Sequence, residues 1–150
     1  MDFNIRTATK NDLPQVLELI KELAVYEKEP DAVVITLEQL EEDGFGETPI
    51  YWIILAENEN SLLGMSFYYI RYSTWKGKSL YLEDLVVKEE YRGHQIGEAL
   101  FNETIKTAKG MGAKAMNWQV LDWNEPAINF YKKFNAELYS EWLNGQLTFK

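Results

Sequence analysis

The segment from Leu80 to Leu121 most constrains the fold, because it reads as a strand, a loop, a helix and a second strand. Leu80–Val87 is mainly apolar and stops just before the polar loop Tyr91–Gly97. Apolar residues then recur at helical spacing over Gly97–Lys109, and Ala115–Leu121 predicts another strand. Two strands joined through a helix lie parallel in one sheet, so we expect a βαβ unit.

The remaining elements predict antiparallel strands and further helices around this unit. Pro14 is tolerated only in the first turn of a helix, so the first helix should begin late in the Thr9–Asn11 region. Thr36 and Gln39 resemble a capping box for a short helix that ends before Gly44. We expect strands at 3–6, 51–57 and 62–72, a helix at 125–134 capped by Asn124, and two final strands joined by a turn at Asn144-Gly145.

Length and composition indicate one α/β domain with a mixed sheet. The chain has 150 residues, with no linker or repeat. It has no apolar run of the roughly 20 residues that a membrane span needs, and its first residues do not resemble a secretory signal. It contains no cysteine and one histidine, His94, so we expect no disulfide and no metal site. The absence of cysteine fits a reducing cytoplasm.

The negative charge argues against a nucleic-acid partner. The formal net charge is -9, and such a surface repels phosphate backbones but attracts cations. Between Glu27 and Glu59 ten acidic residues are opposed only by Lys28. A purely solubilising role of this acidity is the simpler reading of the composition alone.

The loop Tyr91–Gly97 has the features of an anion-binding site. Gly93 and Gly97 permit close backbone approach, Arg92 adds a positive charge, and the helix that follows presents free N–H groups at its start. The loop lacks the Gly-Lys-Ser/Thr of a Walker loop and the spacing of a dinucleotide fingerprint. By itself, the loop could equally be a plain turn before a helix.

The order of elements and this loop resemble the GCN5-related N-acetyltransferase superfamily. Arg92, Ile96 and Gly97 match its Arg/Gln-x-x-Gly-x-Gly/Ala pattern, whereas Gln95 stands where the family usually has Gly. A second signature, Asn124-x-x-Ala127-x-x-Phe130-Tyr131, also fits, with Asn135 in the place of a later Gly. The resemblance implies the GNAT fold, a mostly antiparallel mixed sheet whose central parallel pair splays apart at an acetyl-CoA site.

A closer resemblance covers almost the whole chain. Tyr81-Leu82-Glu83-Asp84 and Trp123-Asn124-Glu125-Pro126 are similar to the spermidine/spermine N-acetyltransferases, and Tyr72–Gly77 is similar to their thialysine-acetylating relatives. Ser73 stands where the polyamine branch has Asp. The resemblance implies a homodimer that acetylates a primary amine of a diamine, a polyamine or a lysine analogue such as thialysine.

The chemistry of such a reaction asks for a base and an acid. An alkyl ammonium has a pKa near ~10.4, so only about one molecule in 2,500 is nucleophilic at pH 7. Glu83 and Asp84 end a strand beside the loop, and strand alternation predicts that one of them faces the cleft. The resemblance favours Glu83 as the base and Tyr131 as the acid that protonates the thiolate. Without it, they would be a surface pair and a core tyrosine.

The resemblance also implies the binding residues. Acetyl-CoA would be held by the end of one strand, the loop and the last helix, and the amine by acidic and aromatic side chains. The cofactor set is Leu85, Val86, Val87, Arg92, Gly93, His94, Gln95, Ile96, Gly97, Glu98, Asn124 and Tyr131, and the amine set is Tyr26, Glu27, Trp75, Glu83 and Asp84. A coenzyme A-binding regulatory module without turnover and an acetyltransferase of protein amines remain as alternatives.

Overall fold

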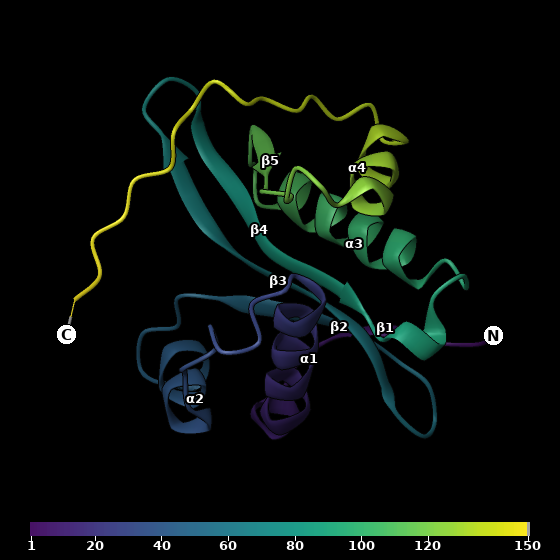
Figure 1. The fold of residues 1–150 in the computed structure, drawn as a ribbon. Helices are drawn as coiled ribbons and strands as arrows, with labels where there is room; N and C mark the ends of the chain where they lie inside the picture. Colours follow the sequence, from purple (N-terminus) through teal and green to yellow (C-terminus); the bar gives the residue numbers. More distant parts are fainter. Residues whose placement is uncertain (150) are drawn as a thin grey trace. The chain divides into compact units, whose positions relative to one another are not determined.

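The computed structural model describes residues 1–149, which fall into two compact units, Met1–Gln119 and Val120–Lys150. The first unit holds one five-stranded sheet in the order β1-β2-β3-β4-β5, drawn in Figure 1. Its elements are β1 (Asn4–Thr7), η1 (Lys10–Asp12), α1 (Leu13–Tyr26), α2 (Leu37–Phe45), β2 (Trp52–Glu57), β3 (Leu62–Ser73), β4 (Gly77–Val87), η2 (Glu89–Tyr91), α3 (Ile96–Gly110) and β5 (Ala115–Asn117).

The sheet confirms the predicted fold class. Strands β1 to β4 are antiparallel, and β4 pairs with β5 in parallel from Ser79 to Tyr81. The predicted βαβ unit is therefore present. In the described chain the parallel pair lies at the edge of the sheet rather than at its centre, because no strand pairs with β5 on its other side. It spans three residues, fewer than the predicted 115–121.

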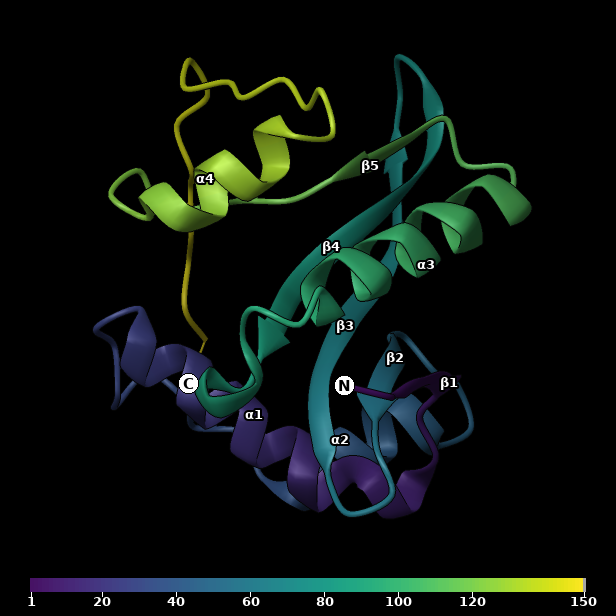
Figure 2. The same cartoon turned by 90° about the vertical axis from the view of Figure 1, so that its right-hand side faces the viewer.

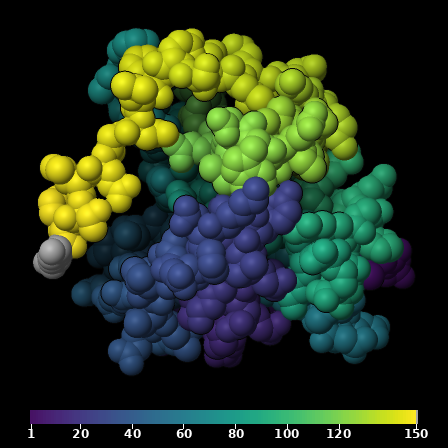
Figure 3. Space-filling model, in the orientation of Figure 1, coloured from purple at the N-terminus to yellow at the C-terminus, as the bar shows by residue number. Residues whose placement is uncertain are grey.

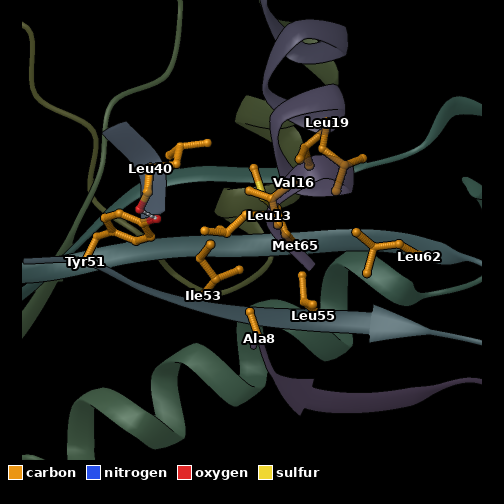
Figure 4. Packing of buried hydrophobic residues seen from close by; sticks show 11 residues of the cluster. Ala8, Leu13, Val16, Leu19, Leu40, Tyr51, Ile53, Leu55, Leu62 and Met65 are labelled. Carbon is orange, nitrogen blue, oxygen red and sulfur yellow. Dashed lines mark hydrogen bonds between the residues drawn. The ribbon is translucent and has the colours of Figure 1, made fainter. Parts of the chain in front are cut away.

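Helices cover both faces of the sheet, with α1 and α2 on one side and α3 on the other (Figure 2). A cluster of buried apolar residues lies on the α1 side, where Leu13, Val16 and Leu19 pack against strand residues such as Leu55 and Met65 (Figure 4). On the opposite side the hydroxyls of Ser66 in β3 and Thr104 in α3 are hydrogen-bonded at 2.6 Å. In β3, Met65 therefore lies on the α1 face of the sheet and Ser66 on the α3 face.

Helix α2 begins as predicted, whereas α1 begins at Leu13, two residues after the predicted Asn11. A short 3-10 turn at Lys10–Asp12 precedes α1, and Pro14 lies in the first turn of α1, where no intrahelical N–H is needed. At α2, Gln39 N–H donates to Thr36 Oγ1 at 3.2 Å, and Gln39 Oε1 accepts from Thr36 N–H at 2.8 Å. This helix includes Gly44 and ends at Phe45, whereas we expected it to end before Gly44.

The second unit contains one helix, α4 (Glu125–Lys132), capped as predicted by Asn124. The helix ends two residues before the expected Phe134, and Asn135 follows in the left-handed conformation at φ 61°. No strand is formed between residues 133 and 149, so the prediction of a final hairpin at Asn144-Gly145 is wrong. A hairpin turn signal is local, and a two-stranded hairpin without further partners is marginal in water. The single-domain expectation stays a prediction.

Candidate functional site

The loop before α3 adopts the torsions that an anion cradle requires. Gly93 has φ 86°, and Gln95 has φ 64° and ψ 18°, which is the left-handed region. A side chain with a Cβ atom adopts this region at roughly 1–2 kcal/mol, so Gln95 does at some strain what glycine would do without it. Helix α3 then begins at Ile96, and its first N–H groups have no partner within the helix. The segment Arg92–Glu98, called the anion loop below, therefore ends on a positive helix terminus.

Arg92 ties the anion loop to the rest of the first unit. Its Nε donates to the carbonyl of Val87 at 3.3 Å, and its guanidinium carbon lies 5.2 Å from the centre of the Tyr26 ring on α1. In the space-filling view, the teal-green residues of this region adjoin the purple and indigo residues of α1 and the segment after it (Figure 3). A pocket of about 360 Å³ lies at this junction, and Lys21, which the sequence analysis missed, lines it with Arg92.

One edge of β4 is open beside the anion loop. Pairing with β5 stops at Tyr81, whereas β4 continues to Val87. Lys88 N–H donates to the Leu63 carbonyl of β3 at 2.8 Å, so the N–H and carbonyl groups of Leu85 and Val87 point away from β3 by antiparallel alternation. Within residues 1–149 no further β4–β5 pair follows, which leaves the N–H and carbonyl of Leu85 and the N–H of Val87 for a strand-like ligand, whereas the Val87 carbonyl accepts from Arg92.

A β-bulge changes the expected direction of the two acidic side chains. Asp84 is opposite Phe67 and Leu82 is opposite Tyr68, so Glu83 is an extra residue in β4. Asp84 shares the face of Phe67, which packs against the α1 core, and Glu83 accepts a hydrogen bond from Tyr69 on that same face at 3.1 Å. The expectation that only one of the pair faces the cleft is wrong, because simple alternation does not hold across a bulge.

The two acids join Glu27 in a cluster of three carboxylates, called the acid cluster below. Burial, followed by the charges of Glu83 and Glu27, raises the pKa of Asp84 to about 7. Burial and then the charge of Glu83 also raise the pKa of Glu27, which caps the C-terminus of α1. The negative end of the α1 dipole adds to this potential. The site is thus built to attract a cation, whose binding would relieve the repulsion.

The sequence of the chain matches that of a known protein family. The chain matches the acetyltransferase (GNAT) family over residues 13–136. The chain belongs to this family. It is a GNAT-type N-acetyltransferase, and GNAT acetyltransferases use acetyl-CoA as co-substrate.

Curated relatives and a solved structure support the same assignment. The GNAT chain is 42% identical to the thialysine N-epsilon-acetyltransferase of Bos taurus over 91% of its own length and 85% of that protein. It is 37% identical to the human spermidine/spermine N(1)-acetyltransferase-like protein 1 over 93% of its own length and 21% of that protein. Its fold matches an aminoglycoside acetyltransferase from a soil metagenomic sample, in complex with trehalose, with a TM-score of 0.80 at 19% identity over 99% and 97% of the two chains.

Homodimer formation, a cytoplasmic location and the absence of a nucleic-acid partner stay predictions. No helix within residues 1–149 combines the length and the apolar character that crossing a membrane requires. In the same part of the chain no group of three or more histidine, cysteine or acidic side chains is arranged to hold a metal ion.

Trp75, a predicted contact of the amine, lies far from the acid cluster within the first unit. Trp75 is 83% exposed in the turn before β4, whereas Glu83 lies six residues after Gly77, about 20 Å along that strand. The structure does not bring Trp75 to the acid cluster, and its contact with the amine stays a prediction. Asn124 and Tyr131 belong to the second unit, where both are buried and the Tyr131 ring lies edge-on to Phe130 at 5.4 Å.

Asp84→Asn is expected to stabilise the ligand-free GNAT domain at pH 8. The pKa of Asp84 rises from 3.8 to about 7 on folding, so between these values the folded chain holds a proton that the unfolded chain has lost. The free energy of unfolding therefore falls as pH rises through this window, and asparagine removes the loss. Since one pKa unit corresponds to about 1.4 kcal/mol, we expect a gain of about 2 kcal/mol or more in urea denaturation.

The gain from Asp84→Asn should shrink as the pH is lowered from 7 towards 4, where the aspartic acid is neutral in the folded state. Asp31→Asn, which changes an exposed aspartate, should change the free energy of unfolding little at any pH. A gain for Asp84→Asn that is the same at pH 5 and pH 8 would show that a buried charge is not its cause.

Proposed function

We propose that this GNAT domain transfers the acetyl group of acetyl-CoA to a primary amine of a small cation, such as a diamine, a polyamine or a lysine analogue. The observation that carries the proposal is the acid cluster of Glu27, Glu83 and Asp84, which lies on one face of the sheet at the bulge of β4. The pKa values of Asp84 and Glu27 are raised by burial and by the neighbouring carboxylates, which is unfavourable without a ligand, and a cationic amine is the ligand that relieves it.

The acid cluster would serve both binding and proton transfer. Its negative field concentrates cations, and one carboxylate accepts the proton that the ammonium must lose before it can attack. Asp84, with a pKa of about 7, is suited to accept a proton at neutral pH. Glu83 is exposed, and the bulge places it on the same face, where it would hold the charged amine. The two acids would share the role that the resemblance implies for Glu83 alone.

The acetyl-CoA side would use the open edge and the anion loop. Leu85 and Val87 would offer backbone groups to the pantetheine arm, whereas those of Val86 face β3 by the same alternation. Arg92 with the N–H groups from Gly93 to Glu98 would offer positive partners to the pyrophosphate. The amine nitrogen then attacks the thioester carbonyl carbon, the C–N bond forms and the C–S bond breaks. Tyr131 donates its phenolic proton to the departing thiolate, because a tyrosine is protonated at neutral pH.

The test is a thiol-release assay of the purified protein with acetyl-CoA and a panel of amines that includes thialysine, putrescine, spermidine and propylamine. We expect acceptors with a second charged group to have a kcat/KM at least about tenfold above that of propylamine. This preference should weaken as salt rises, since exposed charges are screened within about 10 Å at 0.1 M.

Three other results would replace the proposal. Coenzyme A binding in calorimetry without turnover of any amine would favour a regulatory module. Acetylation of peptide amines alone would favour a protein acetyltransferase. Equal use of propylamine and putrescine without a salt effect would leave acetyl transfer standing and remove the selection for cations.

A further inference from the structure

Arg71 lies at the far end of a strip of polar and aromatic side chains that begins at the acid cluster. Tyr69 in β3 is opposite Tyr81 in β4, and their rings are stacked with centres 5.2 Å apart. Tyr69 donates its hydroxyl to Glu83 at 3.1 Å, whereas the guanidinium carbon of Arg71 lies 5.3 Å from the centre of the Tyr81 ring. All four side chains come from the β3–β4 hairpin, the long hairpin of Figure 1.

The two ends of this strip carry opposite charges that act on the same hydroxyl groups. After burial, the charge of Glu83 raises the pKa of both Tyr69 and Tyr81, and Arg71 opposes this rise at each. Arg71 and Glu83 therefore lie within electrostatic range of the same two phenols. The surface beside the acid cluster is not uniformly negative, because it changes sign across the tyrosine pair.

The guanidinium of Arg71 is available to a ligand. Its side chain is exposed, and in the part of the chain that the structure describes it forms no ion pair with a carboxylate. Stacking over Tyr81 uses one face of the guanidinium and leaves its N–H edge, whose planar fork matches a carboxylate. An unpaired arginine beside a cation site repels cations, so a polyamine site would gain nothing from it.

The spacing suits a short molecule with an amine at one end and a carboxylate at the other. Arg71 and Glu83 are about four residue positions apart along the paired strands, or roughly 13 Å between Cα atoms. Their side chains cover part of this distance, since Arg71 reaches over Tyr81 and Glu83 reaches Tyr69. An extended lysine-like amino acid separates its side-chain nitrogen from its carboxylate by about 7 Å. Its α-ammonium would then lie near the tyrosine rings, where cation–π contact is favourable.

We propose that Arg71 binds the α-carboxylate of the acceptor, so that this enzyme selects an amino acid with a side-chain amine over a diamine of the same length. The inference rests on the proposed function, because it assumes that the amine is held at the acid cluster. A diamine or a polyamine would place a positive group where the amino acid has its carboxylate, opposite Arg71. The polar strip would thus rank amino acids above the diamines and polyamines that the acid cluster alone would favour.

The test compares two acceptors that differ only in the carboxylate: thialysine and its decarboxylated analogue bis(2-aminoethyl) sulfide. In the wild type we expect a higher kcat/KM for thialysine. Arg71→Gln should lower kcat/KM for thialysine by about 10- to 100-fold, mainly through KM, because a charge-assisted bidentate pair is lost. It should leave the sulfide diamine unchanged or improve it. Lys76→Gln, which removes an exposed cation from the same hairpin, should change neither substrate.

A second readout does not depend on turnover. Calorimetry with the coenzyme A-loaded protein should show that Arg71→Gln weakens thialysine binding and spares the diamine. Equal losses for both ligands, or no loss for thialysine, would overturn the role of Arg71. Absence of acetyl transfer by the wild type, with carboxylate-selective binding intact, would instead count against the proposed function and leave the Arg71 contact standing.

Discussion

Tyr131→Phe is expected to lower the turnover number for acetyl transfer by about 10²-fold or more, the usual effect of losing a positioned general acid. Phenylalanine keeps the buried ring and its edge-on contact with Phe130, so folding and coenzyme A affinity should change little. The thiolate would then have to leave without a proton. Turnover is measured by thiol release at saturating acetyl-CoA, and affinity by calorimetry.

The matched control for this variant is Tyr139→Phe. Tyr139 lies in the same unit but is 67% exposed, and its hydroxyl bonds only to nearby Glu137. This control should retain wild-type turnover. Wild-type turnover in Tyr131→Phe as well would return Tyr131 to the role of a core aromatic side chain.

Gly97→Asp is expected to weaken coenzyme A binding by about 100-fold, which corresponds to about 2.7 kcal/mol. Gly97 is the second residue of α3, at the helix start where the pyrophosphate is proposed to bind. An acidic residue in the first turn favours the helix dipole, so the variant should be at least as stable as the wild type. The same charge would repel the pyrophosphate and occupy its positive partner. Affinity is measured by calorimetry and stability by thermal unfolding.

Two controls separate charge from size at this position. Gly97→Asn adds a side chain of nearly the same shape without the charge and should cost much less affinity than Gly97→Asp. Lys106→Asp places an acid on an exposed position further along α3 and should have little effect. Unchanged affinity in the folded Gly97→Asp variant would show that the anion loop does not hold the pyrophosphate.

The order of elements in the first unit was predictable because each element carries its own local signal. Helical periodicity with Pro14 located α1, and the Thr36 capping box located α2. The left-handed backbone of Gln95 is a finding of the structure, because a glutamine in place of the family's glycine leaves its conformation open at the level of sequence. The missing final strands show the limit, because whether Asn144-Gly145 closes a hairpin depends on a partner strand elsewhere in the chain.

The sequence alone indicates the acidic residue types of the acid cluster but not their geometry. Glu83 and Asp84 were identified, but the bulge that turns both to one face depends on the register with β3, which no sequence pattern in β4 reveals. Arg71, Tyr69 and Tyr81 were missed for the same reason, because they meet only across the hairpin. Alternation in β3 places Tyr69 and Arg71 on one face, and that was the one signal that could have drawn attention to them.

Because of the bulge, β4 can lose one residue, Glu83, without a change in the sheet face on which its other side chains lie. Leu80 and Leu82, which precede the bulge, point to one face of the sheet. Asp84 and Val86, which follow it, are each paired with a residue of β3. Deleting any other residue of the strand would invert every side chain beyond it and turn apolar groups to solvent. Deletion of Glu83 alone would restore regular pairing between β3 and β4, and every other side chain would stay on its present face of the sheet. One codon can therefore add or remove one carboxylate of the acid cluster while the other side chains of β4 keep their faces, so the charge of this surface can change independently of the core.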